Sequence, residues 1–276
     1  MRAIARDLIA DRIRAVFNDR GRGEAPVRHG EDGLIPPGSV AWRVHGDVMT
    51  MMVGGVSALL LQMLHPAVLA GVWDHSRFRD NMLGRLRRTA RFIAVTTYGG
   101  EAEALAAIER VRFVHRHVRG TLPDGTPYRA DDPELLTWVH VTETRSFLNA
   151  RIRFREPFMS LAEQDRYFAE TAVVARHLGA SDVPESRAST LARIERMRPE
   201  LRVDHRTREV AHLLLHAEPP GLAKRSIQRL ISRAATDLLP GWARQMHTLS
   251  ASTLTRPMVT GGTYGLAEAA QWALRR

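Results

Sequence analysis

Apolar residues recur at intervals of three and four along most of the chain, a spacing that predicts helices. Residues 3–18 predict an amphipathic opening helix, and residues 19–38, rich in Gly, Arg and Pro, predict an extended arm. Ser39 is a suitable N-cap for the next helix. Further helices are expected at 79–97, 101–119, 131–153, 160–178, 184–198, 204–216, 221–237 and 264–275.

Alternation of polar and apolar residues, the signature of strands, is scarce. The turn-rich segment 120–130 alone predicts a small hairpin or loop. The sequence therefore predicts an all-α fold, with an N-terminal helix and arm over 1–38 and one helical domain over 39–276.

Residues 48–73 contain no Asp, Glu, Lys or Arg. Such a length could span a bilayer, but the segment includes Gly54, Gln62, His65 and Pro66, and no second span accompanies it. A helix enclosed in a large core explains an apolar surface on all sides equally well. We expect a buried helix that bends at Pro66, with polar groups beside the bend facing a cavity.

Composition excludes several classes of protein. The chain has 276 residues, 44% of them hydrophobic, and no cysteine, which rules out disulfide scaffolds, thiolate metal sites and cysteine nucleophiles. The net charge is +10, yet Lys224 is the only lysine and the arginines are interleaved with acids. No specific nucleic-acid partner is expected, because basic blocks with stacking aromatics are missing.

The N-terminal residues alternate charged and apolar side chains and lack the unbroken apolar stretch of a secretory signal. The sequence therefore predicts a cytoplasmic protein without a transmembrane span. Peripheral membrane contact stays open, as does the choice between a monomer and a homodimer.

Twelve histidines direct attention to imidazole chemistry. On the predicted helix 101–119, His115 shares the apolar face of Val111 and Val118, whereas His117 is rotated by roughly 200° from it. A neutral imidazole on an apolar face suits a haem iron. The alternative is a core histidine hydrogen-bonded to a carbonyl group, which the pattern alone favours.

Other polar groups lie near the predicted core. Arg85 and Thr89 are one helical turn apart and would suit an anion, a haem propionate or dioxygen; a solvated charged face is the alternative. His65 lies beside the expected bend, where it lines a pocket or caps the broken helix. His140 and Thr144 share one face of their helix.

A competing metal site is Glu209-x-x-His212 with His216 one turn later. Di-iron bundles use the Glu-x-x-His element twice, and no second copy is present here. Hydrolase and phosphate-loop motifs are missing, and the glycine-rich residues 260–265 predict a turn or hinge.

Three segments in this order and spacing resemble one family. They are LLQMLHPAVLAGVWDHS at 60–76, RLRRTARFIAVTTYG at 85–99 and VRFVHRHVRGTLPDGTPYRADDPELLTWVH at 111–140. Together they resemble the family of fungal MpaB oxygenases and bacterial latex-clearing rubber oxygenases, formerly a domain of unknown function. The resemblance extends over about residues 40–240.

The resemblance implies a globin-like helical domain that holds haem b through one histidine. The His-x-x-Val-x-Gly segment assigns that role to His115, with His117 as the less favoured neighbour. Arg85 and Thr89 correspond to residues near the haem in rubber oxygenases. Arg88 stands where those enzymes carry a lysine that can approach the iron, and arginine cannot ligate it because it stays protonated.

The resemblance implies that the protein uses haem b to oxidise an apolar small molecule with dioxygen or peroxide. The donor of the electrons for this reaction is unidentified. Arg85 and Thr89 would donate hydrogen bonds to charge developing on oxygen, and His65 or His140 would carry protons. Thr144 is a further expected cofactor contact. The catalytic glutamate of rubber oxygenases has no assigned counterpart, so polyisoprene cleavage is not implied. Two alternatives remain: a non-haem Glu/His metal oxidase, and a haem-free binding protein for an apolar ligand.

Overall fold

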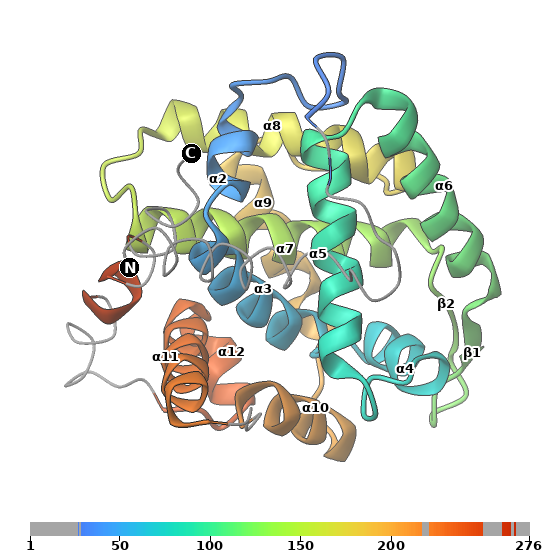
Figure 1. The fold of residues 1–276 in the computed structure, drawn as a ribbon. Helices are drawn as coiled ribbons and strands as arrows, with labels where there is room; N and C mark the ends of the chain where they lie inside the picture. Colours follow the sequence, from blue (N-terminus) through green and yellow to red (C-terminus); the bar gives the residue numbers. More distant parts are fainter. Residues whose placement is uncertain (1–26, 28, 217–220, 251–260, 266–267, 269–276) are drawn as a thin grey trace.

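The computed structural model describes residues 27, 29–216, 221–250, 261–265 and 268 (Figure 1). Within them the regular secondary structure is helical apart from one two-stranded hairpin, so the predicted all-α fold is confirmed. The predicted N-terminal helix 3–18, residues 19–26 and 28 of the predicted arm, and most of the predicted helix 264–275 lie outside the described residues. Residues 261–265, predicted as a turn or hinge, are helical.

The helices succeed one another with short connections. In chain order they are α2 (Val40–His45), α3 (Val48–Gln62), α4 (Pro66–His75), α5 (Met82–Tyr98), α6 (Glu101–His117), α7 (Pro133–Phe154), α8 (Leu161–Leu178), α9 (Arg187–Met197), the 3-10 turn η2 (Arg198–Glu200), α10 (His205–Leu215), α11 (Leu222–Leu238) and α12 (Gly241–Met246). The hairpin pairs β1 (Arg119–Thr121) with β2 (Pro127–Arg129) in antiparallel register.

The core is built on the packing of α3 along α7, which runs across the middle of the molecule (Figure 1). α3 is the uncharged segment and buries most of its side chains. Gly54 permits the close approach, because a Cβ there would lie 2.7 Å from Cδ1 of Phe147 and 3.0 Å from the carbonyl oxygen of Ser146. Trp138 of α7 is fully buried and donates from Nε1 to the carbonyl oxygen of Gln62 at 3.3 Å.

Helix ends carry side-chain caps that explain the boundaries. Asp47 accepts from the backbone N–H of Thr50 at the start of α3. Ser160 and Glu163 form a reciprocal capping box at the start of α8, and Gly179 ends that helix in a left-handed conformation. Capping residues of this kind can be recognised in the sequence. Most helix boundaries were therefore predicted to within a few residues.

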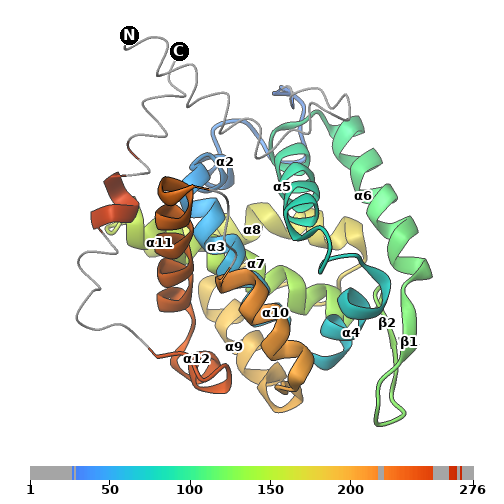
Figure 2. The same ribbon diagram turned by 60° about the horizontal axis from the view of Figure 1, so that its bottom comes forward.

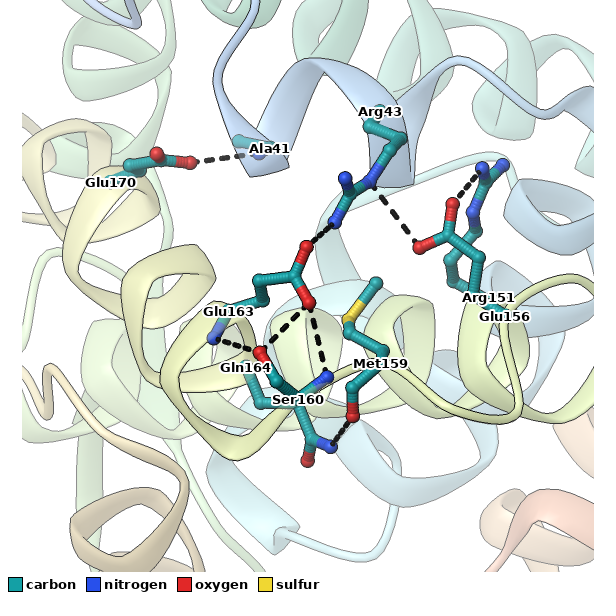
Figure 3. Close-up of polar contacts among 9 residues, drawn as sticks. All are labelled: Ala41, Arg43, Arg151, Glu156, Met159, Ser160, Glu163, Gln164 and Glu170. Atoms are coloured by element: carbon teal, nitrogen blue, oxygen red, sulfur yellow. Dashed lines mark hydrogen bonds and ion pairs between the residues drawn. The ribbon is translucent and has the colours of Figure 1, made fainter.

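α2 is anchored to the α7–α8 corner by ion pairs and a main-chain contact, all visible in Figure 3. The Arg43 guanidinium lies 3.3 Å from Glu156 and 2.6 Å from Glu163. Glu170 of α8 accepts the backbone N–H of Ala41 at 2.8 Å, close to the start of α2. The carboxylate at that helix N-terminus also complements the macrodipole.

α5 and α6 pack against each other as a pair (Figure 2), and α6 also contacts α8. α4 and the hairpin close the same side of the molecule. On the other side α11 covers α3, together with α10. α5 and α7 thus stand on opposite sides of the space that forms the candidate site.

Pro66 starts α4 after the bend that the sequence predicts, and the axes of α3 and α4 differ by 106°. Among the described residues no single helix is long and apolar enough to cross a bilayer; α3 and α4 satisfy the length and composition criteria only as this bent pair.

Candidate functional site

A cavity of about 790 Å³ lies among α4, α5, α6, α7 and α8. This volume is in the range of sites that hold drug-sized ligands and cofactors. Most of its wall is apolar and includes Val68, Val72, Phe92, Ile93, Val139 and Val174. The cavity is therefore a large, mainly hydrophobic chamber in the centre of the helical domain.

The cavity is elongated. Residues between Arg85 and Thr97 of α5 and between Leu135 and Phe147 of α7 line it, and twelve residues of helix span about 18 Å. One end opens to solvent between exposed residues such as Arg88. The other end reaches His45, whose ring packs edge-on to Phe147 at 5.6 Å between centroids.

His115 lies on the cavity wall from α6. Its Nδ1 atom is buried and makes no hydrogen bond within the described part of the chain. Burial lowers its pKa, Asp131 raises it and Arg85 lowers it further. The net direction favours a neutral imidazole at pH 7, the form that binds a metal.

His117 faces the opposite way. It is exposed, does not line the cavity, and its Nδ1 lies 2.8 Å from the carbonyl oxygen of Phe113. Of the two histidines proposed from the sequence, only His115 therefore reaches the chamber.

The arginines of α5 lie at the open end. Arg85 lines the cavity, and burial together with the neighbouring Arg88 lowers the pKa of its guanidinium. Arg88 is exposed at the mouth, as is Arg77. Thr89 is exposed and outside the lining, and its hydroxyl donates to the carbonyl oxygen of Arg85 at 3.2 Å. Thr89 is therefore separated from the chamber that Arg85 faces.

His65 is the N-cap of α4. Its Nδ1 accepts the backbone N–H of Ala67 at 3.3 Å, and its Nε2 lies 3.3 Å from Glu200. The ring is buried but does not line the cavity. The bend at Pro66 creates exposed backbone donors that this imidazole satisfies, which explains its position.

His140 and Thr144 both line the cavity from α7. Burial lowers the pKa of His140 to about 4, and Arg176 adds to that effect. The Nε2 atom of His140 is buried and has no hydrogen-bond partner among the described residues. The Thr144 hydroxyl donates to the carbonyl oxygen of His140 at 2.8 Å.

Glu143 and His45 are two of the polar cavity residues that the sequence did not predict. Glu143 lines the cavity from α7, and burial raises the pKa of its carboxyl to about 7. His45 lines the inner end, where burial lowers its pKa to about 3. The signal for Glu143 was its spacing, three residues after His140 and four before Phe147, which places an acid on an apolar helix face.

The competing site Glu209–His212–His216 lies at α10 and its C-cap, outside the cavity lining. The two imidazoles stack with centroids 4.7 Å apart, and Glu209 lies 3.4 Å from Arg79. No group of three or more His, Asp or Glu side chains suited to a metal ion occurs among the described residues. The geometry gives this alternative no support.

Residues 42–273 match a family described as "ER-bound oxygenase mpaB/B'/Rubber oxygenase, catalytic domain". The match covers most of the chain and includes α4 to α8, which line most of the cavity. Neither a curated protein nor a solved structure matches the chain. The chain belongs to the mpaB/rubber oxygenase family, and membership implies an oxygenase that uses O₂.

Proposed function

We propose that this member of the mpaB/rubber oxygenase family binds haem b in the central cavity through His115 and oxidises an apolar small molecule with O₂ or peroxide. The observation that carries the proposal is the His115 side chain. Its neutral imidazole lines a chamber of about 790 Å³ and has a buried nitrogen without a hydrogen-bond partner in the described chain.

The residues around the chamber fit the group. A haem combines an apolar macrocycle with two propionates at one edge, and the cavity combines apolar walls with arginines at its open end. The guanidinium groups of Arg85 and Arg88 would pair with the propionates. Without such a cofactor or another ligand, an unpaired imidazole nitrogen and a buried guanidinium would carry a desolvation cost.

When bound, haem iron supplies the activation of dioxygen or peroxide, and the protein supplies the surroundings. His115 would ligate the iron. Arg85 would stabilise negative charge that develops near the cofactor, because a fixed cation is most effective in an apolar chamber. His140 has a free buried nitrogen and would hold or move a proton at Nε2.

An apolar substrate is favoured by the walls and by the entrance. Val114 lines the cavity and is 56% exposed, so it offers an apolar contact where the chamber meets solvent. The walls beyond it, including Phe92 and Ile93 of α5, exclude water from the reacting groups.

The test is the cofactor content of the purified protein. We expect a Soret band and, after extraction into alkaline pyridine, about one haem b per chain. Iron without a Soret band would point to the non-haem alternative. A colourless protein that refuses added haemin while keeping its helical circular dichroism would overturn the proposal and leave the haem-free binding protein as the explanation.

A further inference from the structure

Toward the end of the cavity that reaches His45, most polar side chains already have hydrogen-bond partners within the protein. The hydroxyls of Thr96, Thr144 and Thr171 each donate to a main-chain carbonyl one turn earlier in their own helices. His45 uses both ring nitrogens, with Nδ1 2.8 Å from the Thr97 hydroxyl and Nε2 2.9 Å from the Tyr167 hydroxyl.

Glu143 and His140 are the exceptions. Within the described chain Glu143 makes no hydrogen bond and no ion pair, although it is half-buried and lines the cavity. Nε2 of His140 is also buried and unpartnered. The two residues are three positions apart on α7, which places them side by side on one face of the helix.

A purely hydrocarbon ligand would leave both groups unpaired in an apolar chamber, at a cost in binding free energy. A hydroxyl group complements both, because its O–H donates to the carboxyl and its oxygen accepts from an imidazole N–H. An ammonium group complements the pair less well than a hydroxyl group, because Arg176 lowers the pKa of His140 and disfavours a further positive charge beside that imidazole. A carboxylate is disfavoured because the pKa of Glu143 is about 7, so this carboxyl is about half ionised at pH 7 and its charged form would repel a second carboxylate.

We propose that Glu143 and His140 form a subsite that recognises a hydroxyl group on an otherwise apolar substrate. The inference rests on the proposed function in taking this cavity as the substrate site. It narrows the substrate class from apolar molecules in general to apolar alcohols or phenols.

The test compares three probes with equal numbers of non-hydrogen atoms: ethylbenzene, benzyl alcohol and benzylamine. Their dissociation constants are measured by isothermal titration calorimetry at pH 7 on the protein as purified. Ethylbenzene gains more from burial alone, so the informative quantity is its dissociation constant divided by that of benzyl alcohol. We expect Glu143→Leu to lower this ratio about tenfold or more, because it removes a hydrogen bond only the alcohol makes.

Glu195→Leu is the matched control, because it removes an exposed carboxylate on α9 outside the cavity. It should leave the ratio unchanged. Glu143→Gln serves as a second variant that keeps an acceptor, and it should retain most of the preference for the alcohol. If Glu143→Leu fails to fold, the comparison passes to Glu143→Gln and His140→Leu, of which only His140→Leu should lower the ratio.

An unchanged ratio in Glu143→Leu, or in His140→Leu when that variant carries the comparison, overturns the subsite. If the wild-type protein prefers benzylamine to benzyl alcohol, and the substitution removes that preference, the assignment to a hydroxyl group is overturned. Haem content is recorded for the same samples. Haem present with an unchanged ratio defeats the subsite alone, whereas a changed ratio in a haem-free protein supports the subsite and defeats the haem proposal.

Discussion

At the scale of single residues, the chemistry depends on imidazoles and a carboxyl whose pKa values burial shifts toward their neutral forms. His115, His140 and Glu143 face one chamber, and the pKa of each moves toward the uncharged state because the chamber excludes water. Periodicity placed His115 and His140 among the candidates, and the family resemblance assigned His115 its role. Periodicity did not assign Glu143, because whether an acid on a helix faces solvent or a cavity depends on which helices pack around it.

Glu143→Gln should change the pH dependence of stability. Burial raises the pKa of Glu143 in the folded state to about 7 from an ordinary 4.5, so its contribution to stability is fully present below pH 4.5 and is lost as the pH rises through 7. The free energy of unfolding of the variant relative to wild type should therefore rise by about 2 kcal/mol between pH 5 and pH 8.

Urea unfolding at the two pH values measures this difference. Glu195→Gln, which alters an exposed carboxylate, is the control and should give the same difference at both pH values. An equal effect of Glu143→Gln at pH 5 and pH 8 would show that the carboxyl ionises as it does in water.

At the scale of elements, local sequence signals predicted most of the helices. How those helices pack against one another was visible only in the structure. Ser39 marked the start of α2 as its N-cap, and Pro66 marked the bend between α3 and α4. The six-residue α12 was not predicted, because one and a half turns carry too little periodicity. The i, i+4 spacing placed Thr89 beside Arg85, and of the two only Arg85 lines the cavity.

The adjacent glycines of α3 provide a matched test of the α3–α7 packing. A Cβ at Gly54 would lie 2.7 Å from Phe147, whereas one at Gly55 would lie 3.8 Å from the same ring, an ordinary contact. Gly54→Ala should lower the free energy of unfolding by about 1–3 kcal/mol. Gly55→Ala should raise it by up to about 1 kcal/mol, because alanine favours the helix.

Thermal and urea unfolding of the two variants decide the point. If Gly55→Ala loses as much stability as Gly54→Ala, the close approach of α7 to Gly54 does not explain the effect of the Gly54 substitution.

At the scale of the whole molecule, one set of helices encloses the chamber and another carries the rest of the core. α4 to α8 line the chamber, while α9 to α12 add to the hydrophobic core around α3 and α7. The all-α class could be predicted from periodicity. The chamber could not, because a cavity is the space left between helices and no local pattern records it. The family match over 42–273 extends through both sets.

Buried imidazoles should make the folded protein sensitive to acid. The pKa values of His45 and His140 fall to about 3 and about 4, so their stabilising contribution is fully present above pH 6.5 and is lost as the pH falls toward those values. Each should lower the free energy of unfolding by up to about 1.4 kcal/mol per pH unit below 6.5. Glu143 acts in the opposite direction over part of this range.

Urea unfolding of wild type and His45→Gln at pH 7 and pH 5 measures this contribution. The variant should lose less stability on acidification than wild type does. His177→Gln, at an exposed position of α8, is the control and should follow wild type. Identical slopes for wild type and His45→Gln would rule out the buried imidazole as a source of acid sensitivity.

The central claim, that His115 holds haem in the chamber, is tested most directly by the haem content of two variants of one helix. His115→Ala and His117→Ala remove neighbouring imidazoles from the C-terminal turn of α6, one lining the cavity and one exposed. With folding checked by circular dichroism, His117→Ala should bind about one haem per chain, like wild type, and His115→Ala should lose it. Retention of a full Soret band by His115→Ala, or its loss only in His117→Ala, would contradict the account.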